Sequence, residues 1–191
     1  MRNRVMAGRW PRSQGGDMSE LELVSGRIER EGEEIYWEMV RSDDADDRPV
    51  VVLSHGGGGH HGIWYQQIPA LGRLYRIVTW DSRGFGNSTN HNDSPTAEAA
   101  GLDLAAVLDH LAIDRAHLAG QSLGGWHISA FAIANPGRVL SLTYADTVGA
   151  MWTDELRAAM SAFQATGGLG GTRALQLVGG HLALWSGTAL R

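Results

Sequence analysis

The residues with the clearest chemical potential are those of Gly120-Gln121-Ser122-Leu123-Gly124-Gly125. The spacing Gly-x-Ser-x-Gly is typical of a serine on a sharp turn between a strand and a helix. A serine hydroxyl becomes an effective nucleophile when a base removes its proton and hydrogen-bond donors stabilise the resulting oxyanion. Such a turn crowds its neighbours, so side chains at positions 120 and 124 would clash. The motif therefore predicts nucleophilic chemistry at Ser122.

The residues on either side of the motif suit this interpretation. Residues 115–119 form a short run that predicts a buried strand, and residues 123–134 have a roughly helical spacing of apolar side chains. Asn135-Pro136 ends the helix because the residue before proline avoids the α region. Strand, turn and helix are what the motif requires, which disfavours the alternative of a glycine-rich turn with an incidental serine.

A glycine-rich segment follows an earlier apolar strand. Val50–Leu53 predicts a strand buried on both faces, and the next residues are His55-Gly56-Gly57-Gly58-Gly59-His60-His61. The glycines allow the backbone to turn its N–H groups into a pocket. We expect an oxyanion hole formed by the backbone N–H groups of Leu123 and of Gly57.

Two other uses of this glycine-rich segment are disfavoured. A phosphate-binding loop would need Gly-Lys-Ser/Thr or a spaced G-x-G-x-x-G, and neither occurs here. A metal site at His55, His60 and His61 is not expected, because no carboxylate pattern stands beside these histidines.

Strands and helices alternate along the chain, which predicts an α/β fold with a mostly parallel sheet. The first two strands are expected to form an antiparallel hairpin at the sheet edge, and the later strands alternate with helices. The second of these helices is expected to begin at Ser94-Pro95. The carboxyl ends of parallel strands meet at one edge of the sheet, where ligands bind. The predicted strands cover residues 21–29, 35–40, 50–53, 75–80, 115–119 and 139–145, and the predicted helices cover residues 63–71, 95–111 and 123–134.

Together these motifs resemble the α/β-hydrolase superfamily. The resemblance rests on His55-Gly56-Gly57, Asp81-Ser82-Arg83-Gly84-Phe85-Gly86-Asn87-Ser88, the Ser122 motif and Leu142-Thr143-Tyr144-Ala145-Asp146, in the expected order over about residues 21–150. It implies an α/β-hydrolase fold with helices on both faces of the sheet. It also implies that His55 stabilises the glycine loop, and that Asp81 and Arg83 form an ion pair or backbone hydrogen bonds.

The resemblance further implies a triad in the chain order serine, acid, histidine. Asp146 is the candidate acid and His181 the candidate base, and we expect Gly58, Phe85, Gln121 and Trp126 to line the substrate pocket. After residue 150, Thr153-Asp154-Glu155 begins a helix that resembles the start of a cap, and residues 151–191 otherwise form an irregular tail. Too few residues follow for further strand–helix units, so the C-terminal strands are expected to be missing. The chain is then a truncated hydrolase with little or no activity, and the other interpretation is an active hydrolase that uses Ser122 with Asp146 and His181.

Composition sets wider limits. A length of 191 residues predicts one domain, and a net charge of −5 does not favour nucleic acid as a partner. The chain has no cysteine, which is compatible with a cytoplasmic location, and no apolar run approaches the length of a membrane span. Residues 1–17 are a basic leader that we expect to be disordered. Met18 is a second candidate for the start of translation, and residues 18–150 are expected to form the α/β core.

The sequence therefore predicts a serine hydrolase of small esters, lactones or related acyl compounds, with no cofactor and no metal. Serine in place of aspartate at position 122 excludes the epoxide hydrolases and haloalkane dehalogenases of the family. The alternative is a non-catalytic small-molecule binding module that retains the hydrolase pocket.

Overall fold

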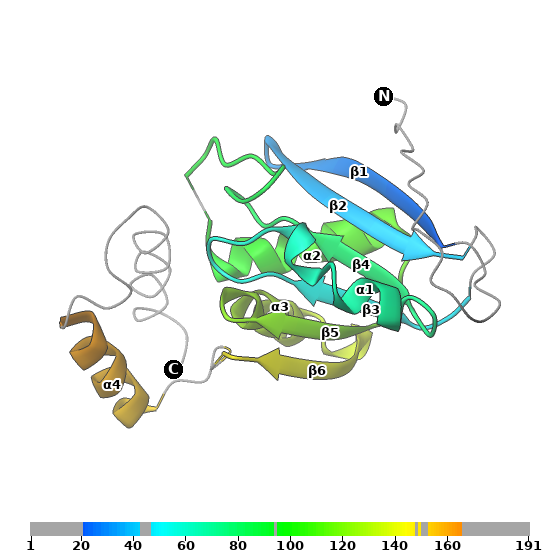
Figure 1. Ribbon diagram of the computed structural model, residues 1–191. Helices are drawn as coiled ribbons and strands as arrows, with labels where there is room; N and C mark the ends of the chain where they lie inside the picture. The colour runs from blue at the N-terminus through cyan, green and yellow to red at the C-terminus, as the bar shows by residue number, and fades with distance from the viewer. Residues whose placement is uncertain (1–20, 43–46, 94, 148, 150–152, 166–191) are drawn as a thin grey trace.

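The computed structural model describes residues 21–42, 47–93, 95–147, 149 and 153–165, and these ranges hold one six-stranded sheet. The order across the sheet is β1-β2-β4-β3-β5-β6 (Figure 1). The strands are β1 (Glu22–Arg30), β2 (Glu33–Arg41), β3 (Val50–Ser54), β4 (Arg76–Trp80), β5 (Ala116–Gln121) and β6 (Val139–Ala145). The helices are η1 (His61–Trp64), α1 (Gln67–Leu71), α2 (Ala97–His110), α3 (Leu123–Ala134), η2 (Pro136–Arg138) and α4 (Asp154–Ala165).

The directions of the strands confirm the predicted α/β class. Strands β4, β3, β5 and β6 are parallel to one another, while β1 and β2 form an antiparallel hairpin that joins the sheet through β4. Because β3 and β5 are neighbours, the glycine segment after β3 and the serine after β5 leave the sheet side by side.

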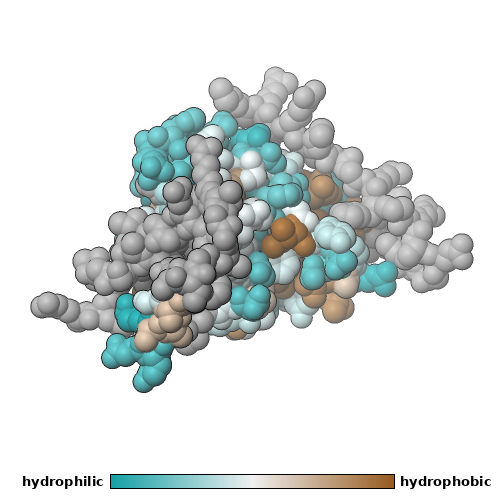
Figure 2. Space-filling model, turned by 60° about the vertical axis from the view of Figure 1, so that its left-hand side comes forward, coloured by the Kyte–Doolittle hydropathy of each residue, from teal (hydrophilic) through white to brown (hydrophobic). Residues whose placement is uncertain are grey.

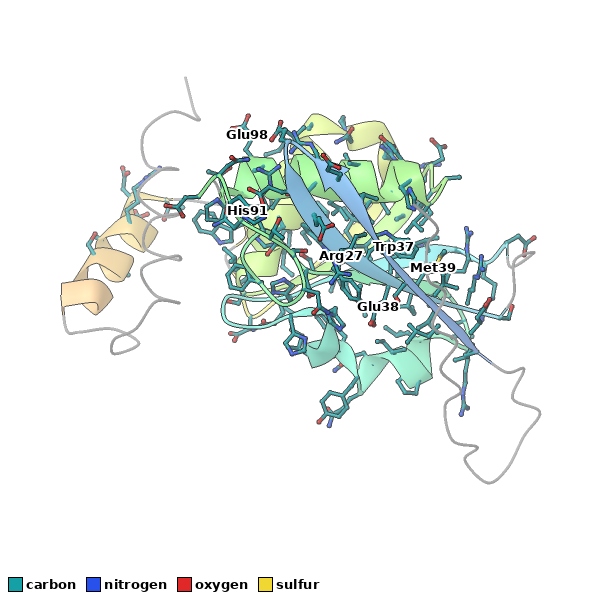
Figure 3. The ribbon with its side chains drawn as sticks, turned by 90° about the horizontal axis from the view of Figure 1, so that it is seen from above. Arg27, Trp37, Glu38, Met39, His91 and Glu98 are labelled. Atoms are coloured by element: carbon teal, nitrogen blue, oxygen red, sulfur yellow. The ribbon has the colours of Figure 1, made fainter. Side chains whose placement is uncertain are left out.

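The sheet is covered on both faces, as predicted. In β3, Val50 and Val52 pack into a core cluster with residues of α2 and α3, whereas Leu53 packs into a second cluster with Trp64 and Ile68 of η1 and α1. This alternation follows from the two-residue period of a strand. Figure 3 shows α2 and α3 on one side of the sheet and α1 on the other.

Two predicted helix boundaries were wrong. Thr96, and not Ser94, caps α2: its backbone is extended and its hydroxyl accepts a hydrogen bond from the Ala99 N–H at 3.0 Å. The segment predicted as one helix over residues 63–71 is split into η1 and α1. A continuous helix would place Pro69 in its interior, where its missing N–H and its ring break the helix, but α1 holds Pro69 within its first turn.

The helix predicted from Thr153-Asp154-Glu155 is present as α4, with two acidic residues in its first turn. The basic leader, the tail after residue 165 and His181 lie outside the described residues. Among the helices described, none has both the length and the apolar composition needed to cross a membrane. Hydrophilic residues cover much of the described surface in Figure 2, around a few hydrophobic ones.

Candidate active site

Ser122 is the single residue between the end of β5 and the start of α3. Its φ of 50° and ψ of −116° are strained for any residue with a side chain. The strained turn is held from both sides, because the Ser122 N–H donates to the Ala145 carbonyl and its own carbonyl accepts from the Gly125 N–H, both at 3.0 Å. Ser122 remains only half-buried, so the residue is not sealed inside the core.

The glycines of the motif are required by close backbone contacts. A Cβ at Gly120 would meet the carbonyl of Gly124, and a Cβ at Gly124 would meet the carbonyls of Ser54 and His55. Backbone atoms of a packed helix or strand cannot move aside as a flexible side chain can. The clash predicted from the sequence is therefore confirmed. At Gly124, the added Cβ would clash with the end of β3, the strand that leads into the glycine loop.

The glycine loop passes directly beside the serine. A Cβ at Gly56 would lie 3.1 Å from the Ser122 Cβ and would overlap the side-chain oxygen of Gln121. The loop then turns back through a hydrogen bond from the Gly59 N–H to the Gly56 carbonyl at 3.1 Å, with Gly58 at a φ of +77°. Gly57 and Gly58 are exposed at the tip.

Leu123 is the first residue of α3, so its N–H has no acceptor within the helix. Donors at the start of a helix favour negative charge in front of them. The turn and the loop are thus adjacent, and the assignment of Leu123 and Gly57 as oxyanion donors remains a prediction.

His55 ties the glycine loop to the segment after β4. It is fully buried, its Nε2 accepts from the Ser82 N–H at 3.1 Å, and its Nδ1 donates to the Gly56 carbonyl at 2.8 Å. Burial lowers the pKa of His55, against the raising effects of the Gly56 carbonyl and Asp81. A neutral imidazole with this tautomer satisfies both contacts, and it stabilises the loop as the family resemblance implied.

Asp81 accepts backbone hydrogen bonds and Arg83 forms ion pairs, each with partners of its own. Asp81 is buried and accepts from the backbone N–H groups of His61 at 2.6 Å and Asn87 at 2.8 Å. Burial acts to raise the pKa of Asp81, but the hydrogen bonds from His61 and Asn87 lower it below its usual range. Arg83 donates instead to Asp103 of α2, with Nε 2.7 Å from Oδ2.

The predicted pocket residues lie in different surroundings. Phe85 is buried with its ring 5.3 Å from that of His55, and Trp126 is buried on α3 with 7% of its surface exposed. Gln121 is half-buried at the end of β5, beside Gly56. Phe85 also lines a small hollow together with Ser82, Arg83, Pro95, Thr96, Ala100 and His127. The contribution of these three residues and of Gly58 to substrate binding remains a prediction.

The candidate acid is close to the serine through the backbone. Asp146 directly follows Ala145, whose carbonyl accepts from the Ser122 N–H, and it is exposed with a φ of 52°. Its partner His181 lies outside the described residues, so the structure leaves the predicted pairing as a prediction.

A serine–histidine pair inside the core was not anticipated from the sequence. Ser54 Oγ of β3 lies 3.3 Å from Nδ1 of His127 on α3, and both residues are buried beneath the site. Only the crossing of α3 over β3 creates this pair, so no local signal could have revealed it. Because Ser54 has no exposed surface, the pair is not accessible to a substrate.

Comparison with known proteins agrees with this geometry. The family model described as "alpha/beta hydrolase fold" matches residues 49–169. The 3-oxoadipate enol-lactonase 1 of Acinetobacter baylyi is 34% identical over 116 residues, which are 61% of this chain and 43% of the relative. The putative carbamate hydrolase RutD of a Caulobacter strain is 38% identical over 101 residues, which are 52% of this chain and 38% of the relative.

A solved structure gives the same result in three dimensions. The crystal structure of a hydrolase from Pseudomonas aeruginosa superposes with a TM-score of 0.62 at 28% identity, covering 83% of this chain and 58% of that one. The chain spans less than half the length of the two curated relatives. The family model nevertheless matches more than half of the chain and includes both the glycine loop and the serine turn, and the chain therefore belongs to the alpha/beta hydrolase family.

Proposed function

We propose that this chain carries the nucleophile and the oxyanion hole of a serine hydrolase, with Ser122 forming an acyl-enzyme. The observation that supports this most directly is the strained backbone of Ser122, positioned between β5 and α3 beside Gly56. Strain of this kind costs about 1–3 kcal/mol and is concentrated at functional sites. A binding-only role provides no reason to keep a serine in that conformation.

The mechanism follows from the positions of the groups. Ser122 Oγ attacks the acyl carbonyl while a base takes its proton, and the N–H groups of Leu123 and Gly57 stabilise the tetrahedral oxyanion. Collapse breaks the bond to the alcohol oxygen, which receives the proton from the base and, in a lactone, stays attached to the acyl group. Water then hydrolyses the ester at Ser122, which releases the acid and restores the serine hydroxyl. In this proposal the base and its orienting acid are His181 and Asp146.

A small ester or lactone is the proposed substrate class. The relative from Acinetobacter baylyi is named as an enol-lactonase, and its similarity to this chain extends over 61% of the residues. A lactone carries the same acyl carbonyl as an open ester, so the nucleophile and the oxyanion hole serve both.

A second form of the proposal assigns the acid and the base to a longer protein of which these residues form part. This form is favoured because the chain matches only 43% of the length of the enol-lactonase and 38% of the length of the putative carbamate hydrolase. Ser122 of the isolated chain would then remain an ordinary hydroxyl, because oxyanion donors alone supply only a small part of the rate.

Intact-mass analysis after treatment with a fluorophosphonate tests both forms. We expect one adduct on an active chain, which is lost in Ser122→Ala and kept in Ser141→Ala, a change at an exposed serine of β6. Loss of the adduct in His181→Ala would assign the base. A folded chain without an adduct supports the second form, and an adduct that survives Ser122→Ala contradicts the proposal.

A further inference from the structure

A cluster of possible metal ligands lies where the glycine loop enters η1. His60, His61 and Asp81 each present a ligand atom, and these atoms lie within 4.8 Å of one another. The sequence alone disfavours a metal here, because no carboxylate stands near the histidines along the chain. The fold supplies one, because the end of β4 brings Asp81 against a segment twenty residues earlier in the chain.

The imidazole of His61 lies between two carboxylates. Its Nδ1 is 3.0 and 2.9 Å from the two oxygens of Asp81, and its Nε2 is 3.4 Å from Glu38 Oε1. Both ring nitrogens therefore face carboxylate oxygens, and a cation bound at Nδ1 would lie between the ring and Asp81.

The outer contacts of His61 match those of a metal-binding histidine. Such a histidine usually donates its second ring N–H to a carboxylate that is itself held by a hydrogen bond. Glu38 Oε1 lies on that side of the ring, 3.4 Å from Nε2, and the same oxygen accepts from the Tyr36 hydroxyl at 2.7 Å. Figure 3 labels Glu38 on β2 and Arg27 nearby on β1, and the Arg27 guanidinium lies over the Tyr36 ring at 5.4 Å.

We propose that His60, His61 and Asp81 bind a divalent transition-metal ion of the Zn²⁺ class. Two imidazoles and one carboxylate are ligands that such ions prefer, and water would complete the coordination. His61 binds through Nδ1, and Glu38 orients its ring. The exposed His60 ring exchanges its present contact with the Gly62 N–H, at 3.1 Å, for the metal. The site does not depend on the chemistry of Ser122.

Titration of the full chain with Co²⁺ and Zn²⁺ tests this proposal. The chain is prepared without added histidines, stripped with a chelator and titrated with each metal alone, by visible absorption for Co²⁺ and by calorimetry for Zn²⁺. We expect one saturable site. His60→Ala and His61→Ala weaken binding at least about tenfold, and Glu38→Gln weakens it about tenfold, as for other outer-shell partners.

His91→Ala is the matched control, because His91 is exposed outside the cluster and its loss should leave the affinity unchanged. His60 is also exposed, so His60→Ala tests ligation even if His61→Ala destabilises the fold. Absence of saturable binding to the folded chain would overturn the proposal. Binding of equal affinity in His60→Ala would overturn it as well.

Discussion

The two edges of the sheet differ in how completely they are packed. One edge is the β1–β2 hairpin, and the other is β6. On the hairpin side, the loop after β4 is bonded to β2 by the Tyr36 N–H to Ser88 Oγ at 2.8 Å and the Glu34 N–H to Thr89 Oγ1 at 2.9 Å. On the other side, five of the seven residues of β6 are exposed. The apolar side chains exposed there include Leu140 at 40%, Leu142 at 38% and Tyr144 at 37%, and Ile133 of α3 is 72% exposed.

This difference shows which parts of the site are supported by packing. The glycine loop is anchored toward the hairpin through His55 and Ser82, whereas the serine turn contacts β3 and also donates its N–H to Ala145 of β6. Asp146 stands at the end of the exposed strand. The glycine loop is therefore built on the packed side, the serine turn is held from both sides, and the candidate acid lies on the exposed one.

The largest expected effect is from removing the carboxylate that pairs with Arg83. Asp103 has no exposed surface and accepts from Arg83 Nε at 2.7 Å and from Arg30 Nη1 at 2.9 Å. Asp103→Ala removes this ion-pair partner from the buried Arg83 guanidinium. We therefore expect the free energy of unfolding in urea to fall by about 3–5 kcal/mol.

The matched control is Asp109→Ala on the same helix. Asp109 pairs with Arg138 at 2.7 Å but its side chain is 66% exposed, so the expected loss is below about 1 kcal/mol. Equal losses in the two variants would show that the hairpin side is not specially packed.

Next in size is the effect of Glu33, which is buried and holds the loop after β4. Burial acts to raise its pKa, but hydrogen bonds from the Thr89 hydroxyl and from the backbone at His91 and Asn92 prevail and lower it from 4.5 to about 2. A lowered pKa in the folded state contributes stability above pH 4.5 that is lost as the pH falls toward 2.

Glu33→Gln should therefore lower the free energy of unfolding at pH 7 by about 1.5–3 kcal/mol, the range for hydrogen bonds to charged groups. It should also flatten the dependence of stability on pH between about 4.5 and 2. Urea unfolding across that pH range measures both effects, and an unchanged acid profile would contradict the role given to Glu33.

A methyl group added at the serine turn should lower the free energy of unfolding by as much as Glu33→Gln does, or by less. Gly124→Ala pushes a Cβ against the carbonyl of Ser54, so we expect a loss of about 1–3 kcal/mol and a lower rate of fluorophosphonate labelling in any chain that labels. Gly137→Ala is the control, because nothing lies within 4 Å of its added Cβ and its stability should change by less than about 1 kcal/mol.

The smallest effect on stability is expected at the exposed edge. An uncharged edge strand is a template for pairing with another chain, and a lysine there opposes it. Leu142→Lys should change the free energy of unfolding by less than about 0.5 kcal/mol. It should nevertheless reduce concentration-dependent association, measured by sedimentation velocity.

Leu102→Lys is the control for that measurement, because Leu102 is similarly exposed, at 42%, but lies on α2 away from the edge. If both variants associate as the unmodified chain does, β6 is not the surface through which copies meet.

The sequence predicted most of the elements because their signals are local. The bounds of β6 and α3 agree with prediction at every residue, since Asn135-Pro136 separates them and an apolar pattern marks each. The start of α2 was misplaced because Ser94, Pro95 and Thr96 all favour a helix start. Which one caps the helix depends on which side chain reaches a free N–H, and that is Thr96.

Contacts between distant segments could not be predicted in the same way. Nothing in the sequence indicates that Arg83 pairs with Asp103 while Asp81 pairs with His61, because all four are ordinary charged or titratable side chains. The buried pair of Ser54 and His127 likewise has no pattern, since its members are separated by 73 positions.

The sequence by itself determined the α/β fold, the strained serine turn and the glycine loop, because each depends on short-range patterns of glycine, proline and apolar residues. Only the tertiary structure decided which side chains meet: Gly56 beside Ser122, and His61 between Asp81 and Glu38. Ion pairs and hydrogen bonds act over a few ångströms in space, whatever the separation in sequence, so their partners are set by how the strands are ordered in the sheet.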